Sequence, residues 1–148
     1  GTDMITVKDI LSEKGLKVWT ISPDAKVLDA LNLMAEKGLG ALVVFLQDDI
    51  VGIVSERDYA RKVILKGRHS HDTKVRDIMT APVYGVHLET TADECMALMT
   101  DKHIRHLPVS KDGKLVGVIS IGDVVKAIID QQKVTIENLE NYIMGKYQ

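Results

Sequence analysis

The chain has 148 residues and a mass of 16.4 kDa, the size of one ordinary domain or of two small repeats that share a core. Its net charge of −2 excludes the broad basic surface of a nonspecific nucleic-acid binder. Its longest apolar run, residues 41–46, is too short to cross a membrane. Cys95 is the single cysteine, which excludes an intrachain disulfide and a multi-thiolate zinc site. Since the first residues show no basic or apolar leader, we expect a cytoplasmic protein.

The first half of the chain predicts a β-α-β-β-α order. Helical spacing of apolar residues begins at Val27, and Gly38 is typical of a helix end. The predicted elements are a short strand over 17–21, a helix from 27 to 37, a strand over 41–46, a turn at Asp48-Asp49, a strand over 50–54 and a helix over 56–65. With aromatic residues at only 4%, we expect an aliphatic core.

The sequence then repeats itself. Residues 51–58 (VGIVSERD) recur 65 positions later as residues 116–123 (VGVISIGD), and no gap is needed between about residues 20 and 65. A second echo, VKDIL at 7–11 and VRDIM at 75–79, is 68 residues apart. Units this small rarely fold alone, so we expect the two to pair.

The repeat sets the predicted domain organisation. Repeat 1 covers residues 5–65, a polar linker 66–74, repeat 2 residues 75–130 and a C-terminal amphipathic helix 131–148. Repeat 2 has the same β-α-β-β-α order. Its helix start carries the capping-box pattern T-x-x-E at 91–94, and K-D-G-K at 111–114 predicts a hairpin turn.

The tail lies outside the repeat. Thr135 is a candidate cap for a helix with Ile136, Leu139 and Ile143 on one face, and Gly145 would end it. Two interpretations stay open: a helix for dimerisation or partner docking, or a helix that packs back on its own domain.

Two carboxylates stand out as candidate ligand-binding groups. A carboxylate offers two charged acceptor oxygens to the adjacent hydroxyls of a ribose, and Asp58 and Asp123 occupy matched positions near helix starts. Ser55 and Ser120 precede them by three residues, where a hydroxyl and free helix N–H groups suit ribose or phosphate. The structural alternative is helix capping and interaction with the helix dipole, and both roles can hold at once.

Other residues favour structural interpretations. Gly52 and Gly117 indicate a hairpin or a close approach of backbone. The run of His69, His71 and Asp72 lies in the polar linker and is typical of exposed histidines rather than of a metal site. Cys95 lies on a core-facing helical position, which predicts a small buried thiol rather than a redox switch.

The duplicated pattern Gly-hydrophobic-x-Ser-x-x-Asp, at 52–58 and 117–123, resembles the cystathionine-β-synthase (CBS) domain pair, also called the Bateman module. The resemblance covers residues 5 to 130 and is closest to small stand-alone prokaryotic CBS-pair proteins. It implies an α/β fold in which two β-α-β-β-α repeats pack as a pseudo-twofold pair. It also implies a non-catalytic sensor that binds AMP, ADP, ATP, NAD(H) or S-adenosylmethionine in clefts between the repeats, dimerises, and regulates a separate protein in trans.

The resemblance also implies two unequal clefts. Arg105, before the second strand of repeat 2, corresponds to a phosphate-binding arginine of the family, whereas Gly40 takes its place in repeat 1 and Arg57 is the cation there. His103 and His106 flank Arg105 and are candidate phosphate neighbours, with helix-end and strand roles as the alternative. We therefore expect the Asp123 cleft to be the stronger nucleotide site, with the Asp58 cleft empty or holding a second nucleotide.

The family builds each cleft from segments of both repeats. The residues expected to take part in the Asp123 cleft include Lys14, Trp19, Arg105, Val118, Ile119, Ser120, Ile121, Gly122 and Asp123. Those expected around Asp58 include Ile53, Ser55, Arg57, Asp58, Thr80 and Tyr84. The strand openings supply adenine walls: Leu39, Gly40, Ala41, Ile104, Arg105 and His106. For Trp19 and Tyr84, a core role is the open alternative.

Our leading hypothesis is therefore an adenine-nucleotide sensor without chemistry of its own, AMP being the first candidate ligand. The alternative is a structural adaptor that dimerises and docks a partner through the tail helix without a ligand. An enzyme is not expected, because no nucleophile-base spacing, P-loop or dinucleotide glycine fingerprint occurs.

Overall fold

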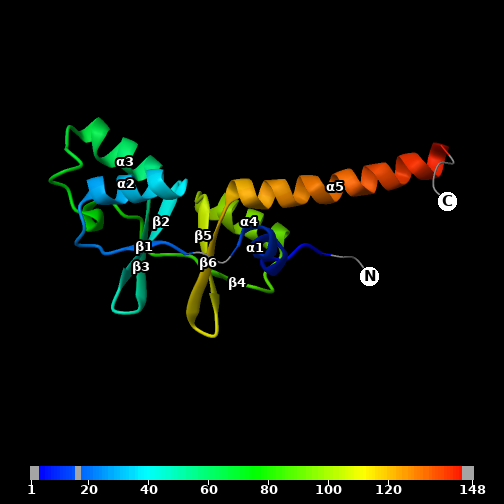
Figure 1. The fold of residues 1–148 in the computed structure, drawn as a ribbon, viewed down its shortest axis with the longest axis horizontal. Coiled ribbons are helices and arrows are strands. Elements are labelled where there is room, and N and C mark those ends of the chain that lie inside the picture. The colour runs from blue at the N-terminus through cyan, green and yellow to red at the C-terminus, as the bar shows by residue number, and fades with distance from the viewer. Residues whose placement is uncertain (1–3, 16–17, 145–148) are drawn as a thin grey trace. The chain divides into compact units, whose positions relative to one another are not determined.

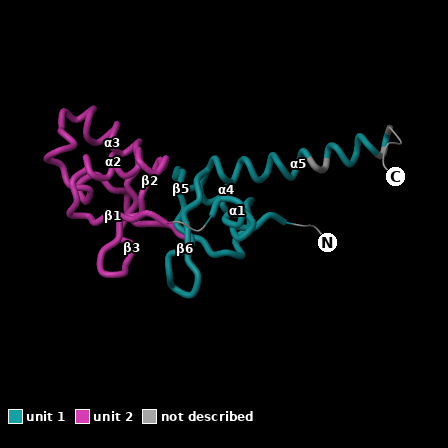
Figure 2. The backbone as a smooth tube through the Cα atoms, in the orientation of Figure 1, with its two compact units in different colours: residues 1–16, 86–148 teal, residues 17–85 magenta. Residues whose placement is uncertain are grey.

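A computed structural model describes residues 4–15 and 18–144. The chain forms two compact units, unit 1 with residues 1–16 and 86–148 and unit 2 with residues 17–85 (Figure 2). The sequence repeat places residues 5–15 in repeat 1, yet this segment packs with the sheet of repeat 2. The segment 75–85 likewise stays with the sheet of repeat 1. Each unit thus combines one sheet with the leading segment of the other repeat.

Unit 2 follows the predicted β-α-β-β-α order (Figure 1). Its elements are β1 (Thr20–Ile21), α2 (Val27–Lys37), β2 (Ala41–Leu46), β3 (Asp49–Ser55), α3 (Glu56–Lys62) and the 3-10 turns Ile64–Lys66 and Val75–Asp77. Strand β2 lies between β1, which runs parallel to it, and β3, which runs antiparallel.

Unit 1 repeats this arrangement. Its elements are α1 (Val7–Lys14), β4 (Val86–His87), α4 (Ala92–Lys102), β5 (His106–Lys111), β6 (Lys114–Ser120) and α5 (Ile121–Met144). Strand β5 lies between parallel β4 and antiparallel β6. The pairing of the two hairpins shifts register at equivalent points, between Val44 and Phe45 and between Val109 and Ser110. The repeat predicted from the sequence is therefore a repeat of backbone geometry.

Local sequence explains most of the element ends. Thr91 and Glu94 form the predicted capping box at the start of α4, and Gly38 ends α2 in the left-handed conformation. In the second hairpin Asp112 and Gly113 both have positive φ, as a tight two-residue turn requires, which confirms the turn predicted at 111–114.

Three predicted boundaries were wrong. The first hairpin turns at Gln47 and Asp48, both with positive φ, so Asp49 already belongs to β3. Of the described residues 18–21, only Thr20 and Ile21 pair with β2 and form the first strand, and residue 17 of the prediction lies outside the described residues. Helix α3 stops at Lys62 instead of residue 65. Val63 and Ile64, β-branched residues of lower helix propensity, follow, and the chain tightens into a 3-10 turn.

The prediction that Thr135 caps a separate tail helix was also wrong. Helix α5 runs unbroken from Ile121 to Met144, so position 135 lies inside it. The 24 residues are a continuation of the last repeat helix and give a length of about 36 Å at 1.5 Å per residue. The predicted end at Gly145 lies outside the described residues.

The segment predicted as a polar linker takes part in the fold of unit 2. Helix α2 begins after Lys26, which makes no side-chain cap. Instead the backbone carbonyls of Thr73 and Ser70 accept the N–H groups of Val27 and Leu28, at 2.8 and 2.9 Å. The linker therefore satisfies two of the amide groups that a helix start leaves unpaired.

Both cores are aliphatic, as the composition predicts. In unit 2 the buried cluster is formed by Val27, Ala30, Met34, Leu42, Val44, Val54, Val63, Val75 and Ile78. In unit 1, Cys95 is fully buried at the position equivalent to Ala30. Burial raises the pKa of the Cys95 thiol to about 11, and the charge of Glu94 adds to this effect. The prediction of a small buried thiol is confirmed.

One glycine in each unit allows two chain segments to pack closely. A Cβ on Gly117 of β6 would come within 2.8 Å of a methyl carbon of Leu11 in α1. A Cβ on Gly52 of β3 would come within 2.7 Å of the Met79 sulfur and 3.2 Å of the Thr80 carbonyl oxygen. Leu11 and Met79 are themselves equivalent in the sequence repeat. The glycines thus let the leading segment of the other repeat lie directly on the hairpin of each unit.

We expect Gly117→Ala to destabilise the protein by about 1–3 kcal/mol, the usual cost of forcing an extra methyl into a packed core. Leu11 is 2% exposed and has little room to move. The matched control is Gly122→Ala in α5, where the new Cβ would meet only the Ser120 hydroxyl oxygen at 3.6 Å. Because alanine favours helices, the control should be neutral or stabilising. Urea unfolding of the two variants measures the difference, and equal stability would contradict the close approach.

Candidate functional site

Asp58 is held by the start of helix α3. The helix begins where β3 ends, and the Ser55 hydroxyl accepts the backbone N–H of Asp58 at 3.1 Å. In return, Oδ2 of Asp58 accepts the Ser55 N–H at 2.9 Å and the Ser55 hydroxyl at 3.0 Å. The capping role named as an alternative is therefore present, and it fixes the direction of the carboxylate.

The second oxygen of Asp58 is also occupied. Oδ1 accepts the hydroxyl of Thr80 at 3.1 Å and lies 3.0 Å from Nζ of Lys62, which also donates to the Ile78 carbonyl at 2.8 Å. The Asp58 side chain is only 11% exposed. A carboxylate has about four acceptor positions. Four protein donors already fill those of Asp58: the Ser55 N–H, the Ser55 hydroxyl, the Thr80 hydroxyl and the Lys62 ammonium.

Asp123 has a more open environment. Ser120 and Asp123 repeat the reciprocal bonds at the start of α5, at 2.8 Å to Oδ2 and 3.1 Å to the serine hydroxyl. Nζ of Lys14 binds the same oxygen, Oδ2, at 2.6 Å. Among the described residues no hydrogen bond reaches Oδ1, and the side chain is 25% exposed.

The surroundings keep Asp123 ionised. Burial raises its pKa, but hydrogen bonds from Lys14 and Ser120 and the charge of Lys14 together outweigh burial, so the pKa of Asp123 lies below its ordinary value. The carboxylate therefore stays charged across the physiological range. A charged acceptor binds hydroxyl donors more strongly than a neutral one does.

Backbone hydrogen bonds hold Arg105 beside the start of α5, where Asp123 lies. The N–H of Ile121, the first residue of α5, donates to the Arg105 carbonyl at 2.8 Å, and His106 pairs with Ser120 across β5 and β6. Unit 1 therefore gathers most of the residues predicted for the Asp123 cleft around one strand–helix junction: Lys14, Ile104, Arg105, His106, Val118, Ile119, Ser120, Ile121, Gly122 and Asp123.

Unit 2 builds the equivalent junction with different chemistry. Glu56 N–H donates to the Gly40 carbonyl at 3.1 Å, as Ile121 does to Arg105, but Gly40 supplies no cation. Arg57 lies exposed on α3. The remaining predicted residues of this unit are Trp19, Leu39, Ala41, Ile53, Ser55, Asp58, Thr80 and Tyr84.

Trp19 has a structural role within unit 2. The indole packs against the buried cluster, and Nζ of Lys37 lies 4.2 Å from its ring centroid. This placement favours the core alternative. A part for Trp19 in the Asp123 cleft remains a prediction.

Sequence reasoning missed Lys62, the ion-pair partner of Asp58. The signal was available, since Asp58 and Lys62 lie four residues apart on a helix and therefore face each other. Lys14 was predicted as part of a segment, but not as the ion-pair partner of Asp123. Because 109 residues separate these two, no local pattern announces the contact.

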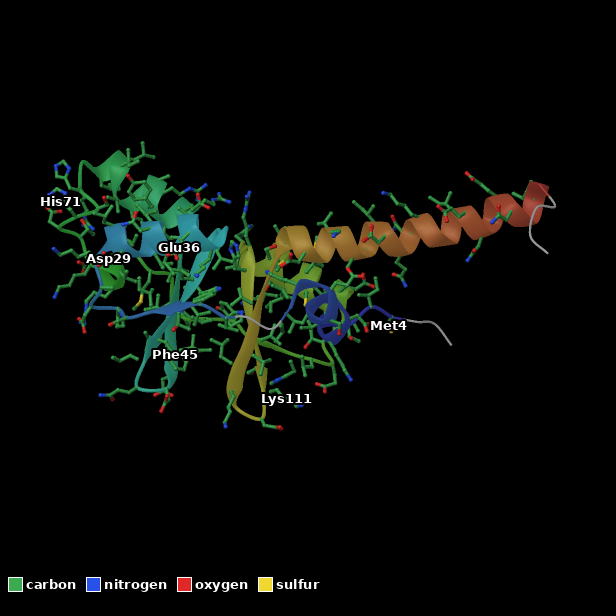
Figure 3. The ribbon with its side chains drawn as sticks, viewed as in Figure 1. Met4, Asp29, Glu36, Phe45, His71 and Lys111 are labelled. Atoms are coloured by element: carbon green, nitrogen blue, oxygen red, sulfur yellow. The ribbon has the colours of Figure 1, made fainter. Side chains whose placement is uncertain are left out.

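The histidines serve different local roles. No group of three or more His, Cys, Asp or Glu side chains suited to a metal occurs in the described part of the chain. His69 and His71 lie at the surface of unit 2, with ring centroids 5.4 Å apart (Figure 3 labels His71). His103 ends helix α4 in the left-handed conformation, the place that Gly38 takes in unit 2.

Comparison with known proteins decides the family. The family model for the CBS domain matches residues 7–65 and 75–130. The chain belongs to the CBS domain family. It is 41% identical to the mitochondrial CBS domain-containing protein CBSX3 of Arabidopsis thaliana over 99% of this chain and 76% of that protein. A solved CBS protein from Burkholderia ambifaria superimposes with a TM-score of 0.81 at 54% identity, over 86% of this chain and 96% of the other.

The resemblance and the fold predicted from the sequence are thereby confirmed. The chain also matches the inosine-5′-monophosphate dehydrogenase of Thermoplasma acidophilum at 36% identity, but over only 21% of that enzyme's length. Within the described residues, no helix is both long enough and apolar enough to span a bilayer.

His103 allows a test of strain beside the site. Its φ of 55° is unfavourable for any residue with a Cβ, so His103→Gly should stabilise the protein by about 1 kcal/mol. The matched change Gly38→Ala, at φ 66°, should destabilise by a similar amount. Thermal unfolding of both variants measures this, and a loss of stability in His103→Gly would show that the imidazole contributes more than its strained backbone costs.

Proposed function

We propose that this protein is a regulatory sensor that binds an adenine nucleotide, AMP first, at the Asp123 site of unit 1. The observation that carries the proposal is the contrast between two equivalent carboxylates. Asp58 has both oxygens occupied and its side chain is 11% exposed, whereas Asp123 keeps Oδ1 open and its side chain is 25% exposed. An ionised, partly exposed carboxylate fixed by its own helix start suits the two hydroxyls of a ribose.

Charge around Asp123 supports a phosphorylated ligand. Lys14 and Arg105 both belong to this junction. In unit 2, residues 80–85 after the VRDIM echo include no lysine or arginine, and Gly40 occupies the position of Arg105. A ribose on Asp123 would place a 5′-phosphate where two cations are available. ATP, ADP, NAD(H) and S-adenosylmethionine share the adenosine part and are the further candidates.

A distant protein with the same fold shows what such a scaffold holds elsewhere. The CBS domain pair of protein MJ0100, 22% identical with a TM-score of 0.74, was crystallised with 5′-methylthioadenosine and S-adenosylmethionine. At this identity the likeness concerns the fold, and our ligand assignment depends on the residues of this chain. The sensor would act on a protein in trans, without chemistry of its own, and we keep the cytoplasm as its proposed location.

Isothermal titration with AMP, ATP, NADH and S-adenosylmethionine, on protein freed of copurified nucleotide, tests the proposal. We expect micromolar AMP binding with one site per chain. Asp123→Ala should weaken it at least tenfold, because two charge-assisted hydrogen bonds are worth about 1.5–3 kcal/mol each. Arg105→Ala should weaken AMP more than adenosine.

The matched control is Asp130→Ala on the same helix, which should bind as the unchanged protein does. Asp58→Asn should also leave the first binding event intact, because that carboxylate is already saturated. Absence of heat with all four ligands would overturn the sensor, and equal loss in the Asp123 and Asp130 variants would overturn the site.

A second candidate function, self-association through α5, is favoured by an exposed apolar stripe. Five side chains on this helix are between 38% and 77% exposed: Val125, Ile129, Ile136, Leu139 and Ile143. With Gln132 between them they follow a spacing of four and three residues, the heptad pattern of a coiled coil. Figure 3 shows no other described element beside the far half of this helix.

We propose that the stripe is covered by α5 of a second copy of this chain. Lys126 and Glu140 each follow a stripe residue on the same edge, so an antiparallel copy would bring the lysine of one helix beside the glutamate of the other. A related CBS-CP12 protein from cyanobacteria, 31% identical, is hexameric. This assembly is compatible with the sensor and would also serve the adaptor.

Analytical ultracentrifugation of Ile136→Asp tests the stripe. A charge in the stripe should dissociate a dimer, whereas the matched Asn138→Asp, off the stripe on the same helix, should not. Removal of residues 131–148 should have the same effect as Ile136→Asp and leave AMP binding unchanged. A dimer that survives Ile136→Asp would exclude α5 as the interface, and loss of AMP binding on truncation would contradict separate roles.

A further inference from the structure

Lys14 occupies the carboxylate that we assign to the ribose. Its ammonium lies 2.6 Å from Oδ2 of Asp123 and donates to the Val118 carbonyl at 2.9 Å. Both partners lie at the strand–helix junction of the site. In the structure the group that would hold the ligand is therefore paired with a cation from another element.

Lys14 is the last residue of helix α1, whose start is held by several hydrogen bonds. Thr6 and Asp9 form a capping box at the start of α1, and the Val7 N–H donates to the Thr90 carbonyl at 2.8 Å. Leu11 packs on Gly117, and Lys14 follows three residues later on the same helix face. The contact that requires Gly117 thus also directs Lys14 toward Val118 and Asp123.

This arrangement is not a by-product of the repeat. In unit 2 the cation beside the carboxylate is Lys62, one turn along the same helix as Asp58, and the equivalent position in unit 1 is Ala127. The residues that follow the VRDIM echo in unit 2, 80–85, include no lysine or arginine. Lys14 is therefore specific to the open carboxylate.

The pairing has a consequence for which ligands can bind. A neutral nucleoside that takes both oxygens of Asp123 must displace the ammonium and leave it without its counter-charge. A ligand with a phosphate offers the displaced ammonium a new anion. Exchange of one ion pair for another keeps a counter-charge beside the ammonium, which the partly buried pair would otherwise lose.

We infer that Lys14 is a charge-selective latch: it occupies Asp123 in the empty site and moves to the phosphate of the ligand, so the site favours adenine nucleotides over neutral adenosine. The inference rests on the proposed function and adds a specificity determinant to it. It differs from a plain phosphate contact, since a latch also opposes the binding of the neutral nucleoside.

Titration of AMP and adenosine, at one ionic strength, into unchanged protein and Lys14→Met tests the latch. Methionine keeps the length of the side chain and removes the charge. We expect adenosine to bind severalfold more tightly to Lys14→Met and AMP more weakly, so that the ratio of the two affinities falls at least tenfold. Lys14→Arg should keep the preference, and Lys8→Met, an exposed lysine on the same helix, should change nothing.

A ligand-free readout guards the result. Carbon-13 NMR of the Asp123 carboxyl should show its pKa rise in Lys14→Met, because Lys14 holds that pKa down. No rise would show that the ion pair is absent and would overturn the latch.

The other outcomes separate the two proposals. AMP weakened with adenosine unchanged would make Lys14 a phosphate contact only and overturn the latch, while the nucleotide site stands. Failure of the unchanged protein to bind either compound would overturn the proposed function and the latch together.

Discussion

The arrangement of both junctions depends on one local interaction, the reciprocal bond between a serine at a strand end and an aspartate three residues into the next helix. Ser55 with Asp58 and Ser120 with Asp123 each close this bond within 3.1 Å. It satisfies amide groups at the helix start. It also holds the aspartate side chain in one rotamer, so that the carboxylate has a fixed direction. One oxygen is committed to the backbone, so the environment of the other decides what the site can do.

The two copies have diverged at that second oxygen. In unit 2, Thr80 and Lys62 close the Asp58 carboxylate and make it part of the unit's own structure. In unit 1 the corresponding oxygen of Asp123 has no described partner, and Lys14 pairs with the oxygen already used by the cap. The duplicated motif therefore has both carboxylate oxygens paired in one copy and leaves one acceptor oxygen open in the other. The motif by itself does not distinguish these cases.

The sequence alone predicted the helix ends and turns that depend on a few neighbouring residues. The capping box at Thr91, the left-handed end at Gly38 and the Asp112-Gly113 turn follow from residue type and spacing. The first turn was predicted one residue too late, because Asp48 and Asp49 carry the same side chain and Gln47 is an uncommon residue at positive φ. The continuity of α5 was missed because Thr135 is a good cap by type, while its neighbours extend a helix already begun at Ile121.

What the sequence could not give is the set of contacts between distant segments. Leu11 on Gly117 and Lys14 on Asp123 join residues more than 100 positions apart, and the repeat pattern assigns α1 to the other sheet. These contacts give Gly117 of the motif a structural role that the sequence pattern does not show. A Cβ at Gly117 would push α1 away from β6, and with it the ammonium that sets the charge at Asp123. Both residues of the motif therefore contact α1: Gly117 leaves room for Leu11, and Asp123 binds Lys14.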